Sequence, residues 1–164
     1  MKTIKYFLEF LLITILFIVF KFLGLKLASN LGSFIGRLIG PFFRSEKKII
    51  SNIKMALPNL GEKNIKIIVK KMWSNYGRIL SEYIFMKNFR NAKNEKFLAV
   101  EGQEILNNIK STGEPVVFVS GHFNNFELMA MQIDKFGINL ATIYRPLNNI
   151  FLNKIMENIR KKYI

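Results

Sequence analysis

The chain has 164 residues, half of them hydrophobic, and its 25 basic residues against 11 acidic ones give a formal net charge of +14. This length suffices for one domain with a core, and the charge favours an anionic partner such as a phospholipid surface, a phosphorylated substrate or nucleic acid. The absence of cysteine excludes disulfides, a thiol nucleophile and cysteine-ligated zinc, and the single histidine excludes a multi-histidine metal centre. Because no aromatic–basic RNA-binding motif is present, nucleic acid is the weaker interpretation.

The N-terminal part is the most apolar stretch of the chain. It runs from Phe7 to Leu25 and is interrupted by Glu9 and Lys21, and its charge-free part, Phe10–Phe20, is shorter than the ~20 residues of a full membrane span. A short span and a helix lying in the membrane interface are therefore both consistent with it. A cleaved signal peptide is the alternative, but no small-x-small cleavage site follows, so the sequence favours an uncleaved anchor.

A second apolar segment, Leu31–Phe43, carries glycines at four-residue spacing. Gly32, Gly36 and Gly40 would form a ridge that lets helices or lipid approach closely. We expect residues 1–43 to form a hydrophobic membrane-anchoring segment, followed by an α/β domain that begins at residue 44.

Helical and strand-like patterns follow one another in the rest of the chain. Apolar residues recur at helical spacing over Arg44–Ala56 and Glu62–Met86, which predicts two amphipathic helices. Three strands are expected after these helices, at Phe97–Val100, Val116–Val119 and Leu140–Tyr144, with helices at Gln103–Ile109, Asn124–Lys135 and Asn149–Tyr163. Strands that alternate with helices imply right-handed crossovers. The predicted fold is α/β, with N-terminal membrane-associated helices followed by an incomplete, mostly parallel sheet flanked by helices.

The residues that could take part in catalysis or substrate binding lie at the ends of two predicted strands. His122 follows Val116–Val119 and Arg145 follows Leu140–Tyr144, and ligands gather beyond the carboxyl ends of parallel strands. A neutral imidazole accepts a proton near neutral pH, and an acid such as Glu127 can fix its tautomer. The guanidinium of Arg145 suits a phosphate or an oxyanion.

Simpler interpretations exist for each of these residues. Asn124 and Glu127 have the spacing of a helix capping box. His122 is then a surface histidine and Arg145 an ordinary surface ion-pair former. Three features together favour a functional site: His122 and Arg145 share one edge of the predicted sheet, a glycine precedes the histidine, and the arginine follows one strand later. A His-Glu-x-x-His metalloprotease motif is missing, and Ser120 lacks the Gly-x-Ser-x-Gly elbow of a serine hydrolase.

Two sequence blocks carry a resemblance to a known family. Gly121-His122-Phe123-x-Asn125-Phe126-Glu127-Leu128 closely resembles the Gly-His-x-Gly-Asn-Trp-Glu block of the bacterial lipid A biosynthesis (lauroyl/myristoyl) acyltransferases. Tyr144-Arg145-Pro146-Leu147-Asn148-Asn149 looks like their Tyr-Arg-Pro block. Two positions depart from the pattern, because Asn124 replaces the glycine and Phe126 replaces the tryptophan.

The resemblance implies a reaction and a set of partners. Such enzymes take a fatty acyl chain from acyl-carrier protein and place it on a hydroxyl of a phosphorylated lipid A precursor, at the cytoplasmic face of the anionic bacterial inner membrane, without metal, cofactor or nucleic acid. Carried onto this sequence, His122 is the general base and Glu127 orients it, while Arg145, Asn125 and Tyr144 contact substrate.

Length is the main departure from the family. Its members continue beyond the Tyr-Arg-Pro block, so residues 44–164 are expected to be the N-terminal portion of an acyltransferase α/β domain that is truncated at its C-terminus. The activity of this chain alone is left open. Two alternatives also stay open at this stage. One is a phospholipid-type acyltransferase that acts on a glycerol phosphate acceptor, and the other is an inactive, lipid-binding remnant.

Overall fold

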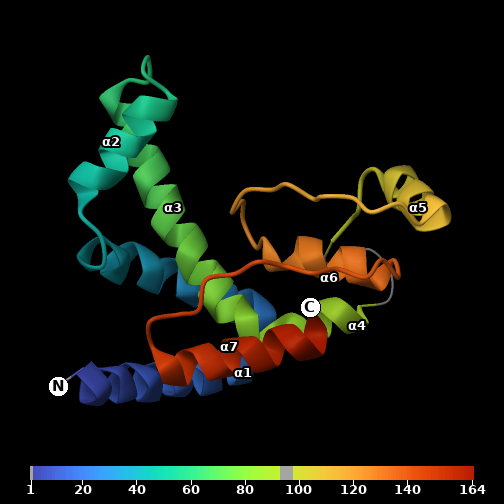
Figure 1. Cartoon of the computed structure of the whole chain (residues 1–164). Coiled ribbons are helices and arrows are strands. Elements are labelled where there is room, and N and C mark those ends of the chain that lie inside the picture. Colours follow the sequence, from blue (N-terminus) through green and yellow to red (C-terminus); the bar gives the residue numbers. More distant parts are fainter. Residues whose placement is uncertain (1, 93–97) are drawn as a thin grey trace. The chain divides into compact units, whose positions relative to one another are not determined.

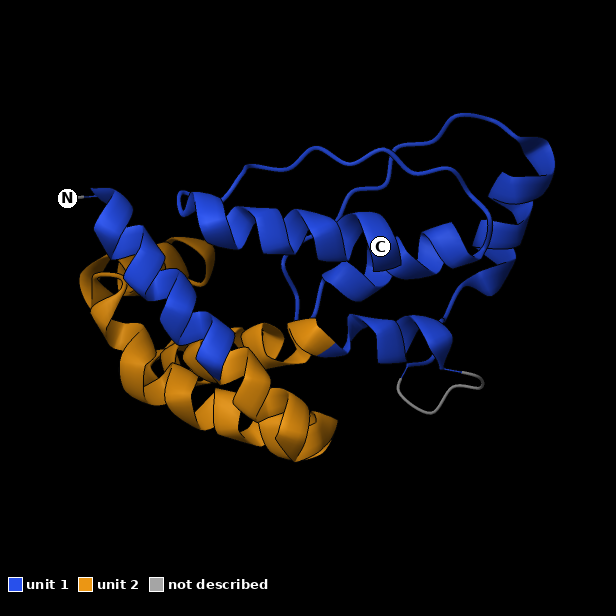
Figure 2. Cartoon of the chain, turned by 90° about the horizontal axis from the view of Figure 1, so that it is seen from below, with its two compact units in different colours: residues 1–15, 85–164 blue, residues 16–84 orange. Residues whose placement is uncertain are grey.

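The computed structural model describes residues 2–92 and 98–164, and every regular element within these ranges is a helix (Figure 1). In chain order these are α1 (Lys2–Ile39), η1 (Gly40–Phe42), α2 (Glu46–Ala56), α3 (Glu62–Glu82), η2 (Tyr83–Phe85), α4 (Met86–Asn91), α5 (Gln103–Thr112), α6 (Glu127–Lys135) and α7 (Ile150–Tyr163). The chain forms two compact units (Figure 2). Unit 1 comprises residues 1–15 and 85–164, and unit 2 comprises residues 16–84.

The predicted parallel sheet is wrong. The segments Val116–Val119 and Leu140–Tyr144 run without regular structure, and no backbone hydrogen bond joins them to each other in the described part of unit 1. Val117 is 88% exposed and Ile143 fully exposed, whereas strands of a parallel sheet are covered on both faces. β-branched residues favour an extended backbone, but a strand also needs a partner for its ladder. Leu98–Val100 forms no strand either, and Phe97 lies outside the described residues.

Helix α1 is long, apolar and divided by a kink. Gly24 has φ 74° and ψ 166°, a conformation open to glycine and strained for other residues, and it separates two helical segments. Of the helices that the structure describes, only the one over Lys2–Phe42 is long and apolar enough to cross a membrane, by length and composition. Its large side chains are mostly exposed, as expected for a helix that faces lipid.

In unit 2, the part of α1 after the kink packs closely on α3. A Cβ atom added at Gly32 would collide with the carbonyl of Gly77, and one added at Gly36 would lie 2.9 Å from the Gly77 Cα. The Ser33 and Ser74 hydroxyls are hydrogen-bonded across the same seam at 2.7 Å. The predicted close approach along the glycine ridge is therefore confirmed, and its partner is a helix of the same chain.

The two predicted amphipathic helices of unit 2 are also confirmed. Ile49 of α2 packs with Ile65 and Val69 of α3 in a small buried core. The core is completed by partly buried residues: Ile50, Ile53, Leu60, Met72 and Trp73. Helix α3 ends at Glu82, earlier than the sequence indicates, and η2 and α4 carry the chain onward.

In unit 1, α4 packs against both α6 and α7. Met86 and Phe89 of α4 and Met131 and Ile133 of α6 are buried. Arg90 connects all three helices, because its guanidinium lies 2.6 Å from Asp134 of α6 and donates to the Tyr163 carbonyl of α7 at 3.2 Å. The observed α6 and α7 match the two helices expected in this region, with α6 beginning three residues later than predicted.

Candidate active site

His122 stands on the non-helical segment that leads into α6. Its side chain is exposed, and its ring lies against the Phe126 ring with the centroids 4.1 Å apart. The ring is therefore accessible to a substrate and is held by an aromatic neighbour at the position of the family's tryptophan.

The turn between His122 and α6 explains one departure from the family motif. Asn124 has φ 45°, in the left-handed region that glycine adopts freely and asparagine tolerates better than other side chains. An asparagine in place of the family glycine is therefore compatible with this backbone. The capping-box interpretation is wrong. Helix α6 begins at Glu127, its N-cap residue is Phe126 and not Asn124, and no side chain forms a capping hydrogen bond.

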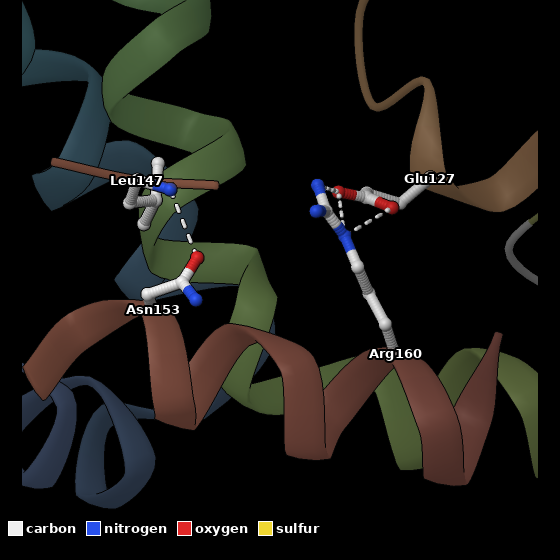
Figure 3. A network of polar contacts seen from close by, with 4 residues as sticks. All are labelled: Glu127, Leu147, Asn153 and Arg160. Carbon is white, nitrogen blue, oxygen red and sulfur yellow. Dashed lines mark hydrogen bonds and ion pairs between the residues drawn. The ribbon is translucent and has the colours of Figure 1, made fainter. Parts of the chain in front are cut away.

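Glu127 is a buried carboxylate bound by an arginine from α7. It is 5% exposed, and the Nε of Arg160 donates to its Oε1 at 3.1 Å and its Oε2 at 3.3 Å, while a terminal nitrogen donates to Oε1 as well (Figure 3). This geometry is that of a charge-assisted, forked ion pair. Arg160 was not predicted from the sequence. The one feature of the sequence that points to Arg160 is its position four residues after Met156, which places it beside the apolar, inward face of α7.

Tyr144 contacts the same stretch of α7. Its hydroxyl donates to the Glu157 carboxylate, and the Arg160 guanidinium carbon lies 5.0 Å from the centre of its ring. The hydrogen bond raises the pKa of Tyr144 and lowers the pKa of Glu157, which also accepts from Asn153 at 2.9 Å. Arg160 thus touches Glu127 of the first sequence block and Tyr144 of the second.

The rest of the Tyr144–Asn149 block is also attached to α7. The backbone N–H of Leu147 donates to Asn153 Oδ1 at 2.9 Å (Figure 3), and Asn149 is the N-cap of the helix. Arg145 lies in this block with an exposed side chain. The block therefore presents Arg145 to solvent from a backbone that is held on both sides.

The structure revises how the predicted site residues come together. The expected common rim of His122 and Arg145 does not exist, because no sheet forms within the described residues. Glu127 and Tyr144 are brought together by α7, and Asn125 is partly buried in the turn before α6.

Two other features of the surface bear on the chemistry. No group of three histidine or acidic residues that could hold a metal ion occurs within residues 2–92 and 98–164. An open, largely apolar surface of α1 is formed by Ile4, Lys5, Leu8, Glu9 and Leu12, and it does not include His122.

Comparison with known proteins identifies the family. The family model described as bacterial lipid A biosynthesis acyltransferase matches residues 1–163, which includes both sequence blocks and α7. No match was found among curated proteins or among solved structures. The family match agrees with the resemblance of the two blocks and covers nearly every residue of the chain. The chain therefore belongs to the bacterial lipid A biosynthesis acyltransferases, a membrane-associated family, and is an acyltransferase.

Proposed function

We propose that this acyltransferase moves a fatty acyl chain from the thioester of acyl-carrier protein to a hydroxyl of a lipid A precursor. The observation that carries the proposal is that Arg160 contacts both Glu127 and Tyr144, so the two blocks typical of the family meet on one helix. These blocks hold the only histidine of the chain and an exposed arginine. A general base and a cation that can bind phosphate suit acyl transfer to an alcohol of a phosphorylated lipid.

His122 acts as the general base in this proposal. Its imidazole takes the proton of the acceptor hydroxyl as the oxygen attacks the thioester carbonyl. The new ester C–O bond forms, the C–S bond breaks, and the imidazolium returns the proton to the departing thiolate. A thioester is already activated, so a positioned base and stabilisation of the oxyanion are sufficient. The exposed imidazole leaves room for both substrates.

Glu127 orients and charge-balances His122 when substrate is bound. Its ion pair with Arg160 fixes the carboxylate at the first turn of α6, five residues after His122. Catalytic hydrogen bonds are often long or poorly aligned before substrate binds and tighten in the complex.

Arg145, with Tyr144 and Asn125, binds the phosphorylated acceptor. A guanidinium forms forked hydrogen bonds with phosphate, and Arg145 is exposed on a held segment. The net charge of +14 also suits an acidic carrier protein and a negatively charged membrane. We place the reaction at the cytoplasmic face of the inner membrane, with residues 1–43 as the anchoring segment.

The test is acyl transfer by the whole chain in phospholipid vesicles. The donor is acyl-carrier protein loaded with laurate or myristate, and the acceptor is a tetraacylated lipid A precursor. His122→Ala should slow transfer by about 100-fold or more, the range expected for loss of a general base. Lys135→Ala, which removes an exposed cation at the end of α6, is the control and should transfer normally.

Three outcomes contradict the proposal. If His122→Ala and wild type transfer at the same rate, His122 is not the general base. Preference for a glycerol phosphate acceptor in direct competition indicates a phospholipid-type enzyme. Binding of anionic vesicles without transfer to any acceptor indicates a lipid-binding protein without turnover.

A further inference from the structure

Asn149, the last residue of the Tyr144–Asn149 block, connects α7 to the N-terminal part of α1. Its side chain is 6% exposed. Its Oδ1 accepts from the backbone N–H groups of Phe151 at 3.1 Å and Leu152 at 3.2 Å. Its Nδ2 donates to the Tyr6 carbonyl at 2.9 Å and to Glu9 Oε2 at 3.0 Å. Both ends of the amide are thus used, the oxygen as a helix cap and the nitrogen as a link between helices.

The contact accounts for a charge in the most apolar part of the chain. Glu9 interrupts an apolar run, where a carboxylate is costly unless it has partners. It receives the Asn149 hydrogen bond, and Lys5 lies 3.8 Å away, one turn earlier. Around this polar contact Phe7 and Phe10 pack on Phe151, with ring centroids 5.9 Å and 5.7 Å apart.

The block that carries Arg145 is therefore held at both ends by different helices. Tyr144 is held by α7, and Asn149 is held by α1, the helix whose exposed side chains include Leu8, Leu11 and Leu12. Only a short piece of backbone separates Arg145 from the α1 contact. A shift of Asn149 relative to α1 must then move Arg145 relative to the apolar surface of that helix.

We propose that Glu9 and Asn149 are a positioning pair that sets where Arg145 stands relative to the lipid-facing surface of α1. The pair would select an anionic amphiphile, whose phosphate reaches Arg145 while its acyl chains remain beside the apolar helix. This inference rests on the proposed function, since it assigns the phosphorylated acceptor to Arg145. Neither residue touches substrate, and both act through the backbone of the Tyr144–Asn149 block.

The test compares Asn149→Asp, Glu9→Gln and their combination. Aspartate still caps α7 but cannot donate to Glu9, and it places a second carboxylate beside it. In the double variant the amide introduced at position 9 can donate to the carboxylate introduced at position 149, which restores the contact with residue 9 in the reversed direction but not the hydrogen bond to the Tyr6 carbonyl. Glu9→Leu leaves the cap untouched and serves if Asn149→Asp does not fold. Lys2→Gln is the control on the same helix, because Lys2 is exposed and takes no part in the contact between Glu9 and Asn149.

The readout is binding to vesicles with and without the phosphorylated lipid A precursor, measured by co-sedimentation in the absence of acyl donor. Asn149→Asp and Glu9→Leu should weaken precursor-dependent binding by about tenfold, the effect of losing one charge-assisted hydrogen bond. The double variant should recover part of this loss, and Lys2→Gln should bind as wild type does. In the transfer assay, KM for the precursor should rise while kcat stays within about twofold.

Binding that is unchanged in both Asn149→Asp and Glu9→Leu overturns the inference. So does an equal loss of binding to vesicles that lack the precursor, or a loss that the double variant does not recover, since either result indicates a merely structural contact. Absence of acyl transfer by the wild type contradicts the proposed function instead. The binding measurement is independent of transfer, so the two failures are distinguishable.

Discussion

The ion pair between Glu127 and Arg160 allows a quantitative prediction for Arg160→Met. The side chains are 6% and 27% exposed, so the carboxylate is buried and the guanidinium is partly in contact with water. Removing one partner of a fully buried ion pair costs about 3–5 kcal/mol, and partial exposure of the arginine reduces this cost. We therefore expect Arg160→Met to lower the free energy of unfolding of unit 1 by about 2–3 kcal/mol. For a chain of this size that corresponds to a decrease in Tm of about 4–12 °C.

Thermal unfolding followed by circular dichroism, in one detergent for all variants, measures the effect. Lys161→Met changes the adjacent exposed residue in the same way and should cost less than about 0.5 kcal/mol. Glu127→Gln combined with Arg160→Met should be more stable than Arg160→Met alone, because no charge is left buried. If Arg160→Met and Lys161→Met have the same Tm, the guanidinium does not hold the carboxylate. The proposed meeting of the two blocks on α7 then loses its support.

Two further predictions concern the helix seam and pH. Gly77→Ser should destabilise unit 2 by about 1–3 kcal/mol, because its Cβ would overlap the facing backbone of α1. The control is Gly61→Ser, which lies at an open helix N-cap and should leave the stability unchanged. Unfolding of both variants is followed by the fluorescence of the single tryptophan of the chain. The hydrogen bond to Tyr144 lowers the pKa of Glu157, so its stabilisation is present above the usual pKa of that carboxyl and is lost as the pH falls through the lowered value. It raises the pKa of Tyr144, so the same contact is also lost as the pH rises through that raised value. Tm measured against pH should therefore separate wild type from Tyr144→Phe only between these limits, and a constant difference at all pH values would refute the assignment.

The helices and the two family blocks are determined by the sequence itself. A helix is closed by hydrogen bonds between residues four apart, so the apolar period predicted over residues 44–56, 62–86 and 149–163 locates each helix to within a few residues. The same holds for the helix cap at Asn149, which bonds backbone groups two and three residues away. The family blocks are local too, because their identity lies in consecutive residues.

The partners of these residues were decided only by the tertiary structure. Val116–Val119 has the composition of a strand, but a strand forms only when a distant segment pairs with it, and no local pattern indicates that pairing. Glu127 meets Arg160 across 33 residues, and Asn149 meets Glu9 across 140. A sequence shows that a buried charge needs a partner, but packing of the helices determines which one it finds. That is why the dyad of His122 and Glu127 stays a prediction, while the contact of Glu127 with α7 came from the fold.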